Sequence, residues 1–345
     1  MTAERADRED AQAESVTPQR SAPLQAVRNA AIVGMLSLAL LEVALRVLGV
    51  TNPVLYERDP DVGYRLKPDQ RVGYLFNNIA INAYGVRDPR PLDTRGQGTQ
   101  RVVCLGDSVT WGGIYIRQEE LFTSIAERKL GNVEVINAGV NGYSTTQMAR
   151  LYEKYLTGLA PDLVVFCVIG RDFERPPVVQ PTSGNIAFPE RRPAVAVVEA
   201  AGLARVSLAA RLGWDWLRTS PQTTRLGDFR GPYEDINVSA IAQAVSAHEV
   251  KNAVLVAHVP SLALSRERIE TRETLRRLQR GGARVVDLGA NTSFDPRDYV
   301  DGVHLSKEGH QKIGAALALA IYDALARGPD DTPEIVPERE DSDPL

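Results

Sequence analysis

The sequence predicts an α/β protein, a three-layer α/β/α sandwich with a parallel five-stranded sheet, and two observations support this prediction. Five short runs of β-branched residues occur between residues 101 and 288, each with the composition of a strand buried on both faces. Stretches with the apolar spacing of helices lie between and after these runs. Such alternation favours a parallel sheet with right-handed crossovers and helices on both faces.

The predicted elements follow one another in a regular order. The strands are Arg101–Gly106, Asn132–Asn137, Asp162–Gly170, Asn252–Val259 and Ala283–Leu288. The helices are Gln118–Leu130, Thr145–Leu159, Val238–His248, Arg266–Arg280 and Lys307–Ala326. Residues 173–233 break the alternation, so we expect an insertion near the strand ends, where a lid or specificity element would lie.

Composition excludes several classes of protein. The 40 Lys and Arg residues against 44 Asp and Glu give a net charge of −4, which argues against a nucleic-acid binder. A hydrophobic content of 43% is enough for a sizeable core. Two cysteines exclude a disulfide scaffold or a Cys-rich zinc module, and Cys104 and Cys167, both on predicted strands, are expected to be inert core thiols.

The N-terminal part of the chain has a strongly apolar segment. Residues 1–27 are polar and charged, and we expect them to be disordered. Residues 28–50 are expected to form an uncleaved single-pass transmembrane anchor if Glu42 and Arg46, one helical turn apart, pair with each other. The alternative is a buried or interfacial amphipathic helix. We expect an anchor in the cell membrane and an extracytoplasmic domain, although flanking arginines do not favour this orientation.

The remaining length divides into three parts. Residues 51–98 carry Pro, Gly, Asn and aromatic residues and are expected to be either a stalk or an ordered arm packed on the main domain. Residues 99–328 form the α/β domain. Residues 329–345 are acidic and proline-rich, so we expect a disordered tail.

Two short motifs bring together the residue types of a serine nucleophile and its base. Ser108 follows a predicted strand in the sequence Gly-Asp-Ser, and ligands of parallel sheets bind beyond the carboxyl ends of the strands. Asp301 and His304 lie three residues apart before the last predicted helix. A serine nucleophile needs a base within hydrogen-bond reach, and that base needs an acceptor that fixes its tautomer. The alternatives are an ordinary turn at Ser108 and a surface Asp–His pair.

The other histidines have no such setting. His310 lies within the last predicted helix and is expected to be structural, and no acidic pattern accompanies His248 or His258. The order Ser, Asp, His is shared with α/β-hydrolases, but the chain has no G-x-S-x-G elbow.

Four blocks in order resemble the SGNH, or GDSL, hydrolase family, and the segment before them resembles the membrane-anchored bacterial members. The blocks are Gly106–Gly113, Asn137–Gln147, Pro161–Phe173 and Asp301–His310. The resemblance implies the SGNH-hydrolase fold, which is flavodoxin-like, and an enzyme without a cofactor or a metal. It also implies that Ser108 is the nucleophile, with Asp301 and His304 as the other members of a triad.

The resemblance further implies an oxyanion hole formed by the backbone of Ser108 and Gly142 together with a side chain of the third block. The family has Asn there, whereas this chain has Arg171. Arg171 could stabilise the oxyanion with altered geometry, bind an anionic substrate group, or pair with Asp107, Asp172 or Glu174. Substrate-binding roles are expected for Trp111 and Asn141, and Tyr115 and the insertion are expected to shape an acyl pocket.

These residues predict a serine esterase, deacetylase or O-acyltransferase that acts on carboxylic esters, with acylated glycans or lipids of the cell envelope as substrates. The alternative is a weakly active or non-catalytic carbohydrate- or acyl-binding protein of the same fold, which Arg171 motivates. A metal-dependent phosphoesterase is least favoured, because it needs clustered acidic and histidine ligands.

Overall fold

The computed structural model describes most of the chain, namely residues 22–75, 77–179, 188–202, 204, 232–247, 254–262 and 265–326. At its centre is a parallel five-stranded sheet with the order β6-β5-β7-β8-β9. The strands are β5 (Gln100–Gly106), β6 (Val133–Gly139), β7 (Leu163–Val168), β8 (Val254–His258) and β9 (Arg284–Asp287). The predicted fold class is confirmed, and each strand lies within two residues of its predicted bounds or inside them.

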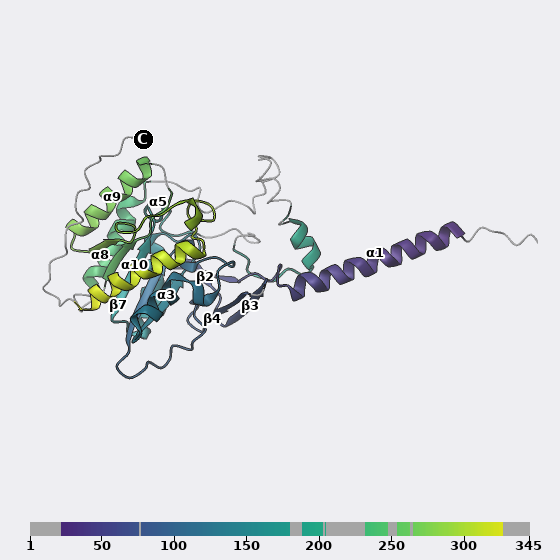
Figure 1. Ribbon diagram of the computed structural model, residues 1–345, viewed down its shortest axis with the longest axis horizontal. Helices are drawn as coiled ribbons and strands as arrows, with labels where there is room; N and C mark the ends of the chain where they lie inside the picture. Colours follow the sequence, from purple (N-terminus) through teal and green to yellow (C-terminus); the bar gives the residue numbers. More distant parts are fainter. Residues whose placement is uncertain are drawn as a thin grey trace, which may run out of the picture.

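Helices cover both faces of the sheet, as a parallel sheet requires (Figure 1). Side chains of β5 alternate between two cores: Val102 and Cys104 face one helical layer, and Val103 and Leu105 face the other. The first layer contains α3 (Phe122–Leu130) and α10 (Lys307–Ala326). The second contains α4 (Thr145–Leu151), α8 (Glu234–Ala247) and α9 (Ser265–Arg280). Cys104 and Cys167 are free thiols buried in the first core, as expected.

Two predicted helices are interrupted. The 118–130 pattern divides into the 3-10 turn η1 (Gln118–Glu120) and α3, because Leu121 between them is extended. The 145–159 pattern begins as α4 and continues through a π-helical turn, η2 (Tyr152–Leu156), and a 3-10 turn, η3 (Thr157–Leu159). Helix α8 begins at Glu234 rather than at the predicted Val238. Its predicted last residue, His248, lies outside the described residues.

Residues 51–98 form an ordered arm rather than a stalk. Two antiparallel hairpins, β1 (Tyr56–Asp59) with β2 (Gly63–Leu66) and β3 (Gln70–Tyr74) with β4 (Asn77–Ile81), contribute to the same core as α4, α8 and α9. Tyr64, fully buried, donates through its hydroxyl to the backbone oxygen of Asn141. The arm is therefore part of the packed domain.

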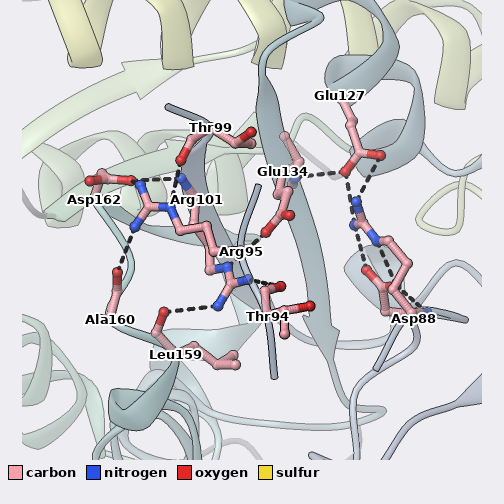
Figure 2. Close-up of polar contacts among 12 residues, drawn as sticks. Asp88, Thr94, Arg95, Thr99, Arg101, Glu127, Glu134, Leu159, Ala160 and Asp162 are labelled. Carbon is pink, nitrogen blue, oxygen red and sulfur yellow. Dashed lines mark hydrogen bonds and ion pairs between the residues drawn. The ribbon is translucent and has the colours of Figure 1, made fainter. Parts of the chain in front are cut away.

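The last part of the arm is bound to the N-terminal edge of the sheet (Figure 2). The guanidinium of Arg101, at the start of β5, pairs with Glu134 on β6 at 2.8 Å and donates to the backbone oxygens of Thr94 and Leu159. Arg95 pairs with Asp162 at the start of β7. These contacts lie at the N-terminal ends of the strands, opposite to the carboxyl ends where the polar motifs lie.

Helix α1 (Ala22–Val47) projects from this body (Figure 1). By length and composition, its segment Leu24–Val47 is able to cross a membrane, and none of it is buried. Residues 22–27 are helical, which corrects the expected disorder up to residue 27; Leu24 and Val27 extend the apolar run backwards. The expected Glu42–Arg46 pair forms, with Nε 2.7 Å from Oε1.

Several expectations lie on residues that the structure does not describe. They are the disorder of residues 1–21, most of the insertion between residues 180 and 231, and the tail 329–345.

Candidate active site

Ser108 lies beyond the carboxyl end of β5, which pairs with β6 and β7, at the first position of the short helix α2 (Ser108–Trp111). Asp107 caps this helix, because its carboxylate accepts the Val109 N–H at 2.8 Å. Gly106 is required by packing: a Cβ there would lie 2.0 Å from Oγ1 of Thr110. The Gly-Asp-Ser sequence therefore fits a tight strand-to-helix turn that projects the serine from the sheet.

Ser108, His304 and Asp301 form a continuous hydrogen-bonded chain. The Ser108 Oγ lies 2.8 Å from Nε2 of His304, and Nδ1 of the same ring lies 2.7 Å from Oδ2 of Asp301. The other carboxylate oxygen of Asp301 accepts the backbone N–H groups of His304 and Val303. This arrangement places the proton of neutral His304 on Nδ1 and directs the basic Nε2 at the serine hydroxyl.

The electrostatics of this chain keep Asp301 charged. Partial burial acts to raise the pKa of Asp301, but hydrogen bonds from the backbone and the ring of His304 outweigh it and hold the pKa below its usual value. Tyr115, whose hydroxyl donates to the Leu305 backbone oxygen at 3.2 Å, has a pKa raised to about 12 by burial and by the charge of Asp301. Tyr115 is therefore a neutral, half-exposed side chain beside the histidine loop.

The resemblance implies that the backbone N–H groups of Ser108 and Gly142 form an oxyanion hole, and the structure describes the surroundings of both groups. Ser108 begins α2, so its N–H has no intrahelical acceptor. Gly142, with φ of 75°, lies in the left-handed region that favours glycine, in the loop between β6 and α4. The Gly142 N–H has no acceptor among the described residues.

Trp111 and Asn141, which were expected to bind substrate, both make contacts with the arm. Trp111 is only 4% exposed and packs in the core under the guanidinium of Arg87. Asn141 uses its side-chain amide to donate to the Tyr56 hydroxyl at 2.9 Å, and its Oδ1 is buried without a partner among the described residues. Both residues connect the site to the arm.

Arg171 is the first residue of α5 (Arg171–Glu174) and is half-buried beyond the end of β7. Arg175, four residues further on, forms ion pairs with Asp107 and Asp172. The Arg175 Nη1 contacts Oδ2 of Asp107 at 3.0 Å, the backbone oxygen of Tyr143 at 2.8 Å, and Asp172. One buried guanidinium thus joins the serine turn, the Gly142 loop and the third block.

Sequence reasoning missed Arg175 and also Arg87. Burial raises the pKa of Asp172 well above its usual value, and the neighbouring Asp107 adds to this effect while Arg175 opposes it. The i,i+3 spacing of Asp172 in α5 and Arg175, which directly follows this helix, is a signal that could have identified this pair. Arg87, fully buried, donates to the backbone oxygens of Trp111, Gly113 and Ile116, and nothing in the arm sequence predicts that target.

No group of three or more His, Cys, Asp or Glu side chains suited to a metal ion occurs among the residues described above.

The comparison with known families identifies the chain. The family described as GDSL-like Lipase/Acylhydrolase matches residues 104–312, which is more than half of the sequence, so the chain belongs to this family. The match includes Ser108, Gly142, Arg171 and the Asp301–His304 loop.

The chain is also similar to solved structures that are distant in sequence. A lipolytic protein of the G-D-S-L family from Desulfitobacterium hafniense is 14% identical with a TM-score of 0.39, covering 64% of this chain and 99% of that one. The lipase/acylhydrolase from Enterococcus faecalis is also 14% identical with a TM-score of 0.40, covering 65% and 96%. No curated protein matches the chain.

Proposed function

We propose that this member of the GDSL-like lipase/acylhydrolase family uses Ser108, His304 and Asp301 as a catalytic triad to hydrolyse or transfer the acyl group of carboxylic esters. Ester hydrolysis is the chemistry of the family. The observation that carries the mechanism is the chain of 2.8 Å and 2.7 Å contacts from Ser108 through His304 to Asp301.

The reaction follows from these contacts. The Ser108 Oγ attacks the ester carbonyl carbon while Nε2 of His304 takes the hydroxyl proton. The negative oxygen of the tetrahedral intermediate accepts hydrogen bonds from the N–H groups of Ser108 and Gly142. The carbon–oxygen bond to the alcohol then breaks, and Nε2 delivers its proton to the leaving oxygen. A water molecule, or a sugar hydroxyl in a transferase, attacks the acyl-serine in the same way.

The substrate proposal rests on the anchor. A chain held in the cell membrane by α1, with its domain on the extracytoplasmic side, meets acylated glycans and lipids of the envelope at high local concentration. The test compares acetate release from an acetylated polysaccharide and from an acetylated lipid. Transfer to an added glycan acceptor distinguishes a transferase from a hydrolase.

The mechanism is tested with the full-length protein in detergent. We expect turnover of a short-chain aryl ester and covalent labelling by a fluorophosphonate, both abolished in Ser108→Ala. Ser246→Ala is the matched control, because the Ser246 hydroxyl donates to the Ala242 backbone oxygen on the exposed face of α8. Retention of full activity in Ser108→Ala would remove the proposed nucleophile.

A second candidate is a carbohydrate- or acyl-binding protein with a weakened site, because Arg171 replaces the donor asparagine of the family. If Arg171 supplies the third oxyanion donor, Arg171→Ala lowers kcat by about 10²-fold and Arg171→Asn retains activity. If the site is a binding site, the parent protein binds acetylated glycan but leaves the fluorophosphonate unreacted, and Arg171→Asn gains turnover.

A further inference from the structure

The end of α1 is bound to a segment that lies about 150 residues further along the chain. The carboxylate of Glu42 accepts the backbone N–H of Ala196 at 3.0 Å and of Val197 at 2.9 Å. Arg46 donates to the backbone oxygen of Ala194 at 2.7 Å. Residues 196–202 form a short helix beside the end of α1 (Figure 1). The ion pair expected only to neutralise the anchor therefore also holds segment 188–202.

The same segment is fixed to the catalytic body. The Phe188 ring packs edge-on against Tyr56 and Tyr64, with centroids 5.2 Å and 4.7 Å apart. Glu190 pairs with Arg58 at 2.7 Å. The β3–β4 turn holds α1 from another side, because the Leu75 N–H donates to the Leu48 oxygen at 2.8 Å. Helix α1 is thus clamped to the domain at its last turns rather than joined by a free linker.

Apolar side chains remain exposed where these segments meet. Leu48, Leu75, Val195 and Val198, which we call the collar, are 40%, 43%, 49% and 69% exposed. Three exposed arginines accompany them on the same segments, namely Arg71, Arg191 and Arg192. Apolar side chains combined with basic ones suit the boundary between acyl chains and anionic headgroups.

Depth along α1 supports the same assignment. Glu42 accepts hydrogen bonds from Ala196 and Val197. It lies five residues before Val47, the last residue of the apolar helix, which corresponds to about 7 Å along the helix axis. An interfacial helix buries its apolar face about 5–10 Å into the headgroup and acyl boundary. Segment 188–202 is therefore held at the depth at which an interfacial helix lies.

We propose that the collar is a membrane-contact surface that rests on the anionic headgroup region of the bilayer crossed by α1 and sets the height of the active site above it. This proposal depends on α1 spanning the membrane, but not on the catalytic mechanism. Because Tyr64 and Asn141 connect the same region to the Gly142 loop, the collar also fixes the orientation of the domain.

The test uses the full chain in nanodiscs of phosphatidylcholine and phosphatidylglycerol. An environment-sensitive nitrobenzoxadiazole dye is attached to Val198→Cys, to Leu36→Cys within α1, or to Leu319→Cys, which is exposed on α10 away from the collar. Native Cys104 and Cys167 are buried, and unmutated protein measures their background labelling.

We expect the dye at position 198 to emit at shorter wavelength than at 319. Lipids with a shallow doxyl quencher should reduce emission at position 198, and lipids with a deep doxyl quencher should reduce emission at position 36. Glu42→Leu, which removes the acceptor for segment 188–202, should reduce the quenching at position 198. Arg191→Gln with Arg192→Gln should abolish the difference between anionic and neutral nanodiscs.

The outcomes distinguish the collar proposal from the prediction that α1 spans the membrane. Quenching at 36 without quenching at 198 would overturn the collar and leave the anchor intact. Short-wavelength emission at 198 without lipid quenching would also overturn it, because protein rather than lipid would then cover the surface. No quenching at either position would mean that α1 does not span the bilayer, and the collar proposal would fall with it.

Discussion

Asp301 makes two kinds of contact with His304, and both depend on its charge. One oxygen holds the ring at Nδ1, and the other accepts backbone N–H groups of the same loop, so the carboxylate fixes the loop and the tautomer together. Because these hydrogen bonds hold the pKa of Asp301 below its usual value, the carboxylate stays ionised above about pH 4. Loss of activity between neutral pH and pH 5 should therefore not arise from Asp301.

The role of Asp301 can be tested with a side chain of the same shape. Asp301→Asn should lower kcat by about 10⁴-fold, because the amide favours the tautomer whose Nε2 carries the proton and cannot take another from Ser108. The measurement is aryl ester turnover by the full chain. Asp295→Asn is the control, since Asp295 caps a 3-10 turn and contacts neither Ser108 nor His304. A loss of less than tenfold in Asp301→Asn would contradict the triad.

Arg175 is the residue on which three parts of the site converge. Its replacement by Met leaves Asp107 and Asp172 close together in a buried site, so we expect the free energy of unfolding to fall by about 3–5 kcal/mol. Asp172→Asn combined with Arg175→Met should recover part of this loss, because an amide avoids the cost of holding a second acidic group beside Asp107 in a buried site.

The same double variant separates stability from positioning. If Arg175 positions Ser108 and Gly142 through Asp107 and the Tyr143 oxygen, kcat stays low in the double variant while its stability recovers. Chemical denaturation and aryl ester turnover give the two values. Arg277→Met, which removes two ion pairs between the exposed surfaces of α9 and α8, is the control and should change both values by little. Recovery of kcat together with stability would assign Arg175 a structural role only.

At the level of elements, the sheet and its helices were predictable because each has a strong local signal. Fully buried strands such as β7 read as unbroken apolar runs, and α10 has both a regular pattern and a clear start. The hairpins of the arm were missed because their strands have four or five residues and contain Asp, Gly, Asn and Gln. Contacts with residues distant in sequence order them, such as those of Tyr143 and Gln147 with the first hairpin and of Ile114 with the second.

Some residues of the candidate site were likewise predictable from the sequence, and others were not. Ser108, Gly142, Asp301 and His304 were recognisable from residue types and block order. Arg175 and Arg87 were not, because the value of a buried guanidinium depends on which carbonyls and carboxylates the fold brings to it. Trp111 is likewise covered by Arg87 of the arm, and no local sequence pattern predicts this contact.

His310 on α10 was expected to be structural, and its setting gives a measurable consequence. Its Nδ1 accepts the Phe122 N–H at 3.1 Å, which joins α10 to α3 and requires a neutral ring. Burial, with a smaller contribution from Arg87, lowers the pKa of His310 to about 3. The unfolded chain binds this proton below about pH 6.5 and the folded protein does not, so stability falls as the pH decreases from 6.5 towards 3.

The slope of this decline identifies His310. Chemical denaturation between pH 7 and pH 5 should give a free energy of unfolding that falls on average about 1 kcal/mol less per pH unit in His310→Gln than in the parent. Glutamine keeps an acceptor for the Phe122 N–H, so the comparison concerns the proton rather than the hydrogen bond. Equal slopes in the two proteins would show that His310 does not carry the effect.

At the scale of the whole molecule, the arm completes the catalytic domain. Arg87 reaches from the arm to three backbone oxygens at and after the end of the serine helix α2. Tyr56 and Tyr64 hold Asn141 next to Gly142. The loops that carry both proposed oxyanion donors thus rest on residues outside the α/β domain. A chain that begins at Gln100 would keep every strand of the central sheet but expose the core that the hairpins cover.

Truncation distinguishes an integral arm from a tether. A soluble chain beginning at Val54 should retain much of the aryl ester turnover, whereas a chain beginning at Gln100 should be largely insoluble or inactive. Arg87→Met in the longer chain tests the same point without deletion, because each carbonyl left unpaired in the core costs about 1–3 kcal/mol. We expect Arg87→Met to lower both the midpoint of denaturation and kcat. Arg58→Met, which removes the exposed Arg58–Glu190 ion pair of the arm, is the control and should change both values by little. If the chain from Gln100 were soluble and as active as the longer one, the arm would be a spacer, and the geometry of the serine loop would be set by the α/β domain alone.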